Sequence, residues 1–159
     1  MSKDIKYVVL DHQVIPEESL NRKPLSVYDM FYEVVRVYNT KVAFLEEHVE
    51  RIINSIKLAG VKKPVSKKQI YQDIKQCINT NNLKNGNIRF SAFTDGKLLI
   101  FLHEVIPHRY PEEKEYQNGV NVAVARFERE RPNIKKWNQT MKDVVRRYVA
   151  IRDVYEVLF

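Results

Sequence analysis

The side chains of this sequence that could do chemistry are mainly cationic. The chain carries 27 lysines and arginines against 20 aspartates and glutamates, a formal net charge of +7. Such a balance attracts anions, which could be nucleic acid, a membrane surface or a phosphorylated ligand. Two cations stand out, Arg51 and Lys135, the latter followed directly by Lys136. A neutral lysine amine is a nucleophile, and a guanidinium fork suits phosphate oxygens.

Each of these cations also has an ordinary explanation. An isolated pair such as Lys135 and Lys136 is commonly two solvated loop residues. Arg51 lies off the apolar face of a predicted helix, so it could point into a cleft or pair on the surface with Glu47, four residues earlier. The residues alone leave both interpretations open.

Several function classes are excluded or disfavoured by what the sequence lacks. The single cysteine, Cys77, excludes an internal disulfide and a multi-cysteine zinc site, so no metal is expected, and its place in an apolar helical pattern predicts a packing role. The densest basic cluster (Lys62, Lys63, Lys67 and Lys68) is interpreted as a solvated loop and helix start. Without an RNP-like motif or zinc-finger spacing, no nucleic-acid partner is expected. No apolar run reaches the roughly 18 residues of a membrane span, and the charged N-terminus does not resemble an export signal, so we expect no membrane partner and a cytoplasmic location.

The elements that must position these residues form two parts. In the first, strands are predicted at 6–10, 31–38, 41–44, 87–94 and 97–106, with a type I′ turn at Asp95-Gly96. Two helices lie between them: one starts at Leu45 and ends before Gly60, and the other is capped by Ser66 and has the apolar stripe Ile70, Ile74, Cys77 and Ile78. This order predicts an α+β fold with a small antiparallel sheet and two helices.

The second part begins after a polar stretch, 111–118, that is interpreted as a linker. A strand at 120–127, a helix at 137–151 and a strand at 154–159 follow, so we expect residues 1–117 to form a small domain and 118–159 to begin an incomplete α/β domain. The apolar last strand has no evident neighbour, which suggests that it needs covering by a partner.

Two stretches of the chain resemble the class IV aminotransferases. They read YEVVRVYNTKVAFLEEHVER from Tyr32 to Arg51 and GVNVAVARFERERPNIKKWN from Gly119 to Asn138; the segments NGNIR and VIPHRYP between them match more weakly. This family of fold type IV pyridoxal-phosphate enzymes includes branched-chain and D-amino acid aminotransferases and aminodeoxychorismate lyase. The resemblance covers essentially the whole chain, in order.

The resemblance implies a role for five residues. Lys135, three positions before Asn138, matches the lysine that forms the Schiff base with the cofactor pyridoxal 5′-phosphate, and Arg51 matches the arginine that holds the cofactor phosphate. Tyr32, Arg89 and His108 match or lie near substrate-binding positions of the family. The implied reaction is amino transfer between an amino acid and a 2-oxo acid, in a homodimer with active sites near the subunit interface.

Departures from the family pattern leave alternatives open. Tyr28-Asp29-Met30 stands where relatives commonly have a Gly-Asp-Gly turn, and this sequence does not hold the family's second half, which supplies the acidic partner of the pyridine nitrogen. The chain is therefore expected to be a shortened one. An elimination of the aminodeoxychorismate lyase type and a non-enzymatic fragment that acts as an interaction module are the alternatives, and a basic nucleic-acid binder would rest on the charge alone.

Overall fold

The computed structural model describes residues 6–126 and 131–158, and its contacts divide the chain into two compact units. The first comprises Met1–His108 together with Asn133–Trp137, and the second comprises Arg109–Pro132 and Asn138–Phe159. The short segment Asn133–Trp137 thus packs with the first unit although the chain on both sides of it belongs to the second. The domain boundary expected near residue 117 stays a prediction.

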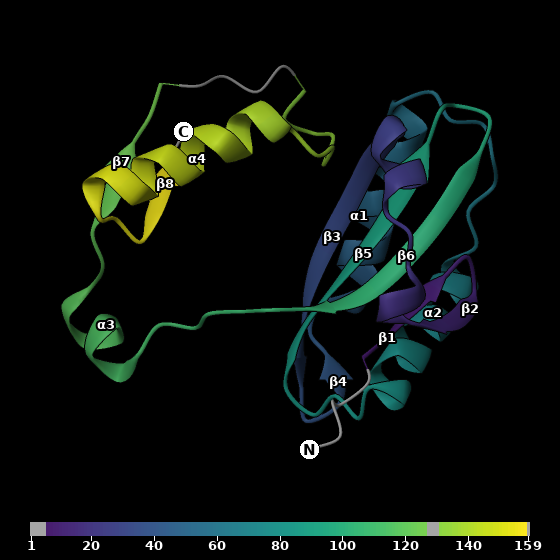
Figure 1. Cartoon of the computed structure of the whole chain (residues 1–159), viewed down its shortest axis with the longest axis horizontal. Coiled ribbons are helices and arrows are strands. Elements are labelled where there is room, and N and C mark those ends of the chain that lie inside the picture. Colours follow the sequence, from purple (N-terminus) through teal and green to yellow (C-terminus); the bar gives the residue numbers. More distant parts are fainter. Residues whose placement is uncertain (1–5, 127–130, 159) are drawn as a thin grey trace. The chain divides into compact units, whose positions relative to one another are not determined.

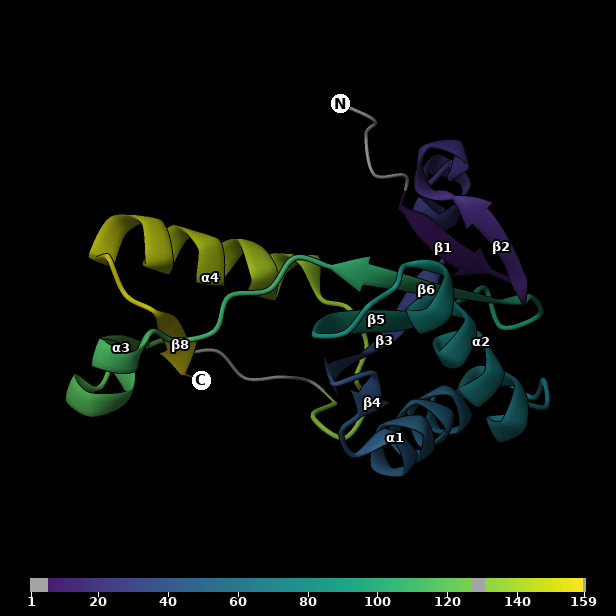
Figure 2. The same ribbon diagram turned by 90° about the horizontal axis from the view of Figure 1, so that it is seen from below.

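The first unit is a six-stranded antiparallel sheet with two helices on one face (Figures 1 and 2). Its strand order is β2-β1-β6-β5-β3-β4. The strands are β1 (Tyr7–Leu10), β2 (Gln13–Pro16), β3 (Asp29–Tyr38), β4 (Lys41–Val42), β5 (Gly86–Thr94) and β6 (Leu99–Ile106), and the helices are α1 (Leu45–Leu58) and α2 (Lys67–Thr80). The predicted α+β class with an antiparallel sheet is confirmed.

Strand alternation decides which side chains of β3 face the helices. Phe31, Val35 and Val37 belong to the main core together with the buried stripes of α1 and α2. Glu33 shares their parity and is fully buried. The opposite face carries a smaller core around Val8, Phe93 and Leu102, to which Leu25 of the 3-10 segment Lys23–Val27 contributes.

The hairpins were predicted in the right places but not in every detail. The turn at Asn39-Thr40 is confirmed, with positive φ at both residues. The return strand predicted at 41–44 is wrong beyond Val42, because Phe44 adopts left-handed φ and leads directly into α1. Strand β2 was not predicted.

The turn between β5 and β6 is not of type I′. Thr94 pairs with Leu99, so four residues form the loop, and of Asp95 and Gly96 only the glycine has positive φ, whereas type I′ requires it at both. The carboxylate of Asp95 instead accepts hydrogen bonds from the backbone N–H of Lys97 and Leu98, at 2.9 and 2.8 Å. This side-chain closure widens the loop and delays the start of β6 to Leu99.

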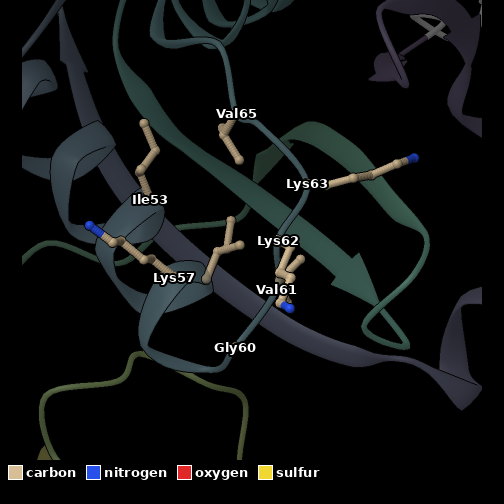
Figure 3. Close-up of a pocket in the computed structure, with 8 residues that line it drawn as sticks. Ile53, Lys57, Gly60, Val61, Lys62, Lys63 and Val65 are labelled. Carbon is tan, nitrogen blue, oxygen red and sulfur yellow. The ribbon is translucent and has the colours of Figure 1, made fainter.

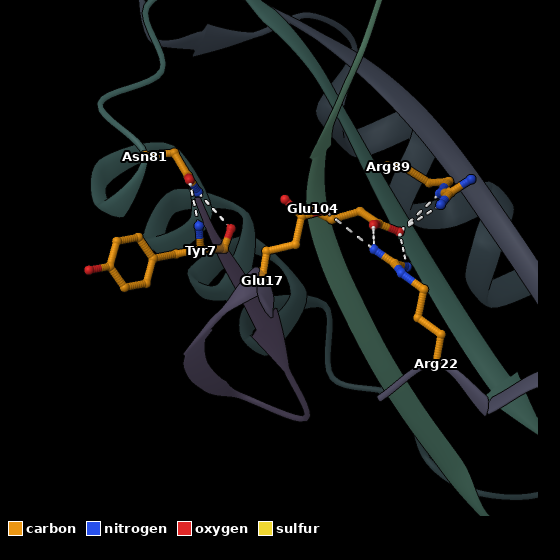
Figure 4. Close-up of polar contacts among 6 residues, drawn as sticks. All are labelled: Tyr7, Glu17, Arg22, Asn81, Arg89 and Glu104. Carbon is orange, nitrogen blue, oxygen red and sulfur yellow. Dashed lines mark hydrogen bonds and ion pairs between the residues drawn. The ribbon is translucent and has the colours of Figure 1, made fainter. Parts of the chain in front are cut away.

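Helix α1 has the predicted ends, and helix α2 has the predicted Ser66 cap and buried stripe. Gly60 follows α1 with φ of +84°, the left-handed conformation expected after a helix C-terminus. The stripe Ile70, Ile74, Cys77 and Ile78 of α2 is buried, and burial raises the pKa of the Cys77 thiol to about 12, so the packing role of Cys77 is confirmed. Asn81, at the end of α2, exchanges two 2.9 Å hydrogen bonds with the backbone of Tyr7 and ties α2 to β1 (Figure 4).

Ser66→Ala is expected to destabilise the protein by about 1 kcal/mol, the usual effect of losing an N-cap hydroxyl. The Ser66 hydroxyl accepts the backbone N–H of Gln69 at 3.2 Å, and alanine would leave that donor without its partner. Urea unfolding at neutral pH measures the loss. Ser66→Asp keeps an acceptor and should restore the stability; an equal loss in both variants would contradict the capping role.

The second unit is a βαβ arrangement preceded by a short helix. Strands β7 (Val122–Val124) and β8 (Glu156–Leu158) pair in parallel and are joined through α4 (Gln139–Arg152). The expectation that the last strand lacks a neighbour is wrong, because β7 pairs with it. The predicted linker is also wrong in part: α3 (Glu113–Asn118) forms within it, held by a capping box between Glu112 and Glu115.

Two predicted strands extend into residues that the structure does not describe. Phe127 and Phe159, the last residues of the strands predicted at 120–127 and 154–159, lie outside the described residues. Across residues 6–126 and 131–158, no helix is long and apolar enough to cross a membrane.

Candidate active site

The segment that carries Lys135 lies along the open edge of β3. The backbone N–H of Trp137 donates to the Met30 carbonyl at 2.7 Å, and the N–H of Tyr32 donates to the Lys135 carbonyl at 3.2 Å. A bridge between Phe31 and Lys136 completes this short antiparallel pairing. On α1, the Ser55 hydroxyl accepts the N–H of Lys135 at 3.1 Å. The backbone of Lys135 is therefore held by β3 and α1 together.

A buried carboxylate, Glu33, gathers the charged groups at this edge. Arg51 donates to it through Nε and Nη2, each at 2.5 Å, and Lys135 Nζ donates to its Oε2 atom at 3.2 Å. The Nδ1 atom of His48 lies 2.8 Å from the same Oε2 atom. The amine and the guanidinium that the sequence singled out, far apart along the chain, thus meet on one oxygen.

The surroundings of Glu33 keep it ionised. Burial by itself would raise the pKa of this carboxyl, but the hydrogen bonds from Arg51 and His48 and the positive charge of Lys135 outweigh burial and lower the pKa below its usual value. The same hydrogen bond raises the pKa of Arg51. At neutral pH the edge of the sheet therefore holds a buried anion with cations on its solvent side.

The two adjacent lysines have different environments. The side chain of Lys135 is 30% exposed and contacts Glu33, whereas Lys136 forms a 2.8 Å ion pair with Asp29 and both partners are about half exposed. Lys136 is thus a surface residue with a surface partner. This difference favours Lys135 as the functional amine.

An aromatic pair stands beside Lys135. The rings of Tyr32 and Trp137 meet edge to face with centroids 5.3 Å apart, and Lys135 Nζ lies 5.5 Å from the Tyr32 ring centre. Tyr32 is half-buried, whereas its neighbour Phe31 is in the core. The guanidinium of Arg89 lies 6.0 Å from the Trp137 ring centre.

Arg89 is held by a second buried carboxylate, Glu104. Its Nε and Nη2 atoms donate to Oε1 of Glu104 at 3.1 and 2.8 Å, and Arg22 donates to Oε2 of the same group at 2.5 Å (Figure 4). Burial opposes ionisation of Glu104, yet the two arginines lower its pKa. The side chain of Arg89 is 25% exposed, and its guanidinium lies 6.0 Å from the centre of the Trp137 ring.

His108 is not brought to this cluster. It is exposed on the segment after β6, and its ring lies next to Gly86, where an added Cβ would come within 3.6 Å of it. Because β3 pairs Gly86 with Val37 and Ser91 with Tyr32, His108 lies near the end of β3 that is far from Tyr32 and Lys135.

A hollow elsewhere on the first unit does not contain any sequence-predicted site residue. It has a volume of about 500 Å³ and lies at the end of α1, where Ile53, Ile56, Val61 and Val65 form an apolar floor between three lysines (Figure 3). The chemistry that the sequence indicates is therefore concentrated at the β3 edge. Among the described residues no group of three or more metal-binding side chains is found.

Sequence reasoning missed the residues that organise the site. Glu33, Glu104 and Trp137 were not selected, although a signal for Glu33 was present: it alternates with Phe31 and Val35 on the apolar side of a strand. A charged residue whose side chain points to the buried face of a strand is usually paired with an opposite charge or hydrogen-bonded. This alternation predicts a paired carboxylate but not the identity of its partners.

Comparisons with known proteins identify the family of the chain. The family model described as "Amino-transferase class IV" matches residues 30–159. A D-alanine aminotransferase of Listeria monocytogenes is 30% identical over 125 residues, which cover 77% of this chain and 41% of that protein. The chain thus spans about two fifths of the length of this curated relative.

Solved structures share the fold. The branched-chain amino acid aminotransferase of Thermobaculum terrenum in its pyridoxal-phosphate form superposes with a TM-score of 0.76 at 19% identity, covering 98% of this chain and 58% of that one. A 4-amino-4-deoxychorismate lyase of Legionella pneumophila, described as putative, gives 0.67 at 18% identity, with 85% and 53% covered. Since the family match extends over residues 30–159, which is most of the sequence, the chain belongs to the class IV aminotransferases.

Proposed function

We propose that the chain forms a pyridoxal 5′-phosphate site of an aminotransferase that moves an amino group between an amino acid and a 2-oxo acid. The observation that carries the proposal is the meeting of Lys135 Nζ and Arg51 Nη2 on one oxygen of the buried Glu33. Substrates of the D-amino acid or branched-chain type are proposed, because the relatives that the chain resembles are named for them.

The donor set fits this cofactor. An aldehyde needs an amine, which Lys135 offers with 30% of its side chain exposed, and a phosphate needs fixed hydrogen-bond donors, which the Arg51 guanidinium offers with half of its side chain exposed. When bound, the cofactor supplies an electron sink for chemistry at the substrate's alpha carbon. Lys135 would bind it covalently and then move the proton at that carbon.

The aromatic and cationic groups beside Lys135 are proposed to hold the substrate. Tyr32 and Trp137 form a wall next to the Lys135 amine, and Arg89 at this wall offers a guanidinium for a carboxylate. His108 remains a proposed substrate contact only on the family resemblance, because it lies near the other end of β3. A homodimer is proposed on the same resemblance.

A lyase is the second candidate, because the aminodeoxychorismate lyase fold matches 85% of the chain with a TM-score of 0.67. Lys135 and Arg51 would serve elimination and amino transfer equally well. Release of pyruvate from an aminated chorismate derivative without an amino acceptor would identify the lyase. A module that only binds partners would give no cofactor-dependent signal.

The test is a cofactor titration followed by product analysis. Trp137 is the only tryptophan and contacts Tyr32 beside Lys135, so bound pyridoxal 5′-phosphate should quench its fluorescence. D-alanine or L-leucine is then added with a 2-oxo acid, and the new amino acid is measured. Quenching together with amino transfer is the expected result. Fluorescence that does not change at saturating cofactor would contradict the proposal.

A further inference from the structure

We propose that Glu33 is the positioning residue of the cofactor site: it holds the Arg51 guanidinium and the Lys135 amine as one unit, so that phosphate and aldehyde are recognised together. This inference rests on the function proposed above and adds a residue to which that function assigns no role. Glu33 would act through its two partners and touch neither substrate nor cofactor.

The burial pattern shows which group is the anchor. The side chain of Glu33 is fully buried, whereas those of Arg51, Lys135 and His48 are 50, 30 and 21% exposed. The three partner side chains therefore reach toward solvent from a fixed anion behind them. An anchor in this position stays in place when a ligand arrives on the exposed side.

The hydrogen bonds leave the needed donors available. Arg51 uses Nε and Nη2 for Glu33, and among the described residues its Nη1 atom has no hydrogen-bond partner. Lys135 uses one of its donors on the same carboxylate. A two-point contact on one edge of the guanidinium orients the other edge, which is the requirement for binding a phosphate.

A purely stabilising ion pair is the competing explanation. Buried ion pairs are weak evidence for stability, and their loss would weaken every property of the folded protein alike. A positioning role makes a narrower prediction: loss of Glu33 should impair recognition of the phosphate more than recognition of the aldehyde.

The experiment compares pyridoxal 5′-phosphate with pyridoxal, which lacks the phosphate. Each aldehyde is titrated against the full chain, reduced with borohydride, and the adduct at Lys135 is quantified by mass spectrometry. Because pyridoxal closes into an internal hemiacetal, only the change between variants in the ratio of half-saturating concentrations is interpreted. The wild-type ratio serves as the reference, and one charge-assisted contact to the phosphate should contribute on the order of tenfold or more to it.

Glu33→Gln is expected to lower the preference for the phosphorylated aldehyde by about tenfold, the scale of that contact. The titrations are made near 1 M salt, where the screening length is about 3 Å, so that removing a negative charge near the phosphate contributes little. Glu47→Gln is the matched control: Glu47 lies one turn before Arg51 on α1 and is exposed, and the structure gives no hydrogen bond between them. It should keep the wild-type preference.

Glu33→Asp retains the charge on a shorter side chain and should give an intermediate preference; it also decides the question if Glu33→Gln does not fold. The inference would be overturned if the folded Glu33 variants bound both aldehydes equally more weakly, so that the ratio of half-saturating concentrations did not change. It would also be overturned if Glu47→Gln lost the preference for the phosphorylated aldehyde to the same extent. The absence of any adduct in the wild-type chain would instead count against the proposed function, so the two failures are distinguishable.

Discussion

Replacing Lys135 with alanine is expected to abolish the borohydride-trapped adduct with pyridoxal 5′-phosphate, the largest effect that we predict for any single substitution. Among the described residues that contact Glu33, the Lys135 amine is the group that can bond covalently to an aldehyde, because the others are a guanidinium and an imidazole. The measurement is the mass of the intact chain after reduction, with the modified residue located by peptide mapping.

Lys136→Ala is the matched control, since it removes the same side chain one residue later. Lys136 pairs with Asp29 at the surface and has no contact with Glu33, so this variant should retain the adduct at the wild-type level. The assignment of the functional lysine would be wrong if the adduct persisted in Lys135→Ala, or if peptide mapping of the wild-type chain found the adduct on Lys136.

Glu104→Gln is expected to cost about 3 kcal/mol of stability at neutral pH, the lower end for breaking a buried ion pair. Glu104 is almost completely buried and holds both Arg22 and Arg89. We expect a value at the lower end of this range because the Arg22 side chain is nearly half exposed, so water can solvate its charge once Glu104 is removed. Urea unfolding measures the loss, and Glu50→Gln, which removes the exposed partner of Lys67, should change stability little.

The same substitution should also flatten the acid dependence of stability. The pKa of Glu104 is lower in the folded chain than its ordinary value of 4.5, so the unfolded chain binds the proton first as pH falls. The contribution of Glu104 is therefore complete above about pH 4.5 and is lost as the pH falls through the lowered folded pKa. Unfolding curves between pH 3 and pH 7 should show a shallower slope for Glu104→Gln, and parallel curves would contradict the paired role.

The elements of the fold could be predicted where local signals agree. Helix α2 has an N-cap serine and a periodic stripe, and both are as expected. Helix α3 was missed because it has no apolar stripe. The sequence signal for its start is the capping box of Glu112 and Glu115, which consists of polar residues only. The type I′ turn predicted between β5 and β6 was wrong. It relied on the preference of the Asp-Gly dipeptide, whereas hydrogen bonds to the Asp95 side chain close the loop.

The sequence by itself determined the alternation of β3, the ends of α1, the N-cap of α2, the family, and the candidate residues Lys135 and Arg51. It did not determine that Glu33 joins these two, that Lys136 turns to the surface, or that β8 has a partner in β7. Periodicity and caps act over a few residues and can be read locally, whereas these contacts connect positions up to 102 residues apart. Only the folded chain brings such positions within hydrogen-bonding distance, because the buried core sets where each strand edge and helix face must lie.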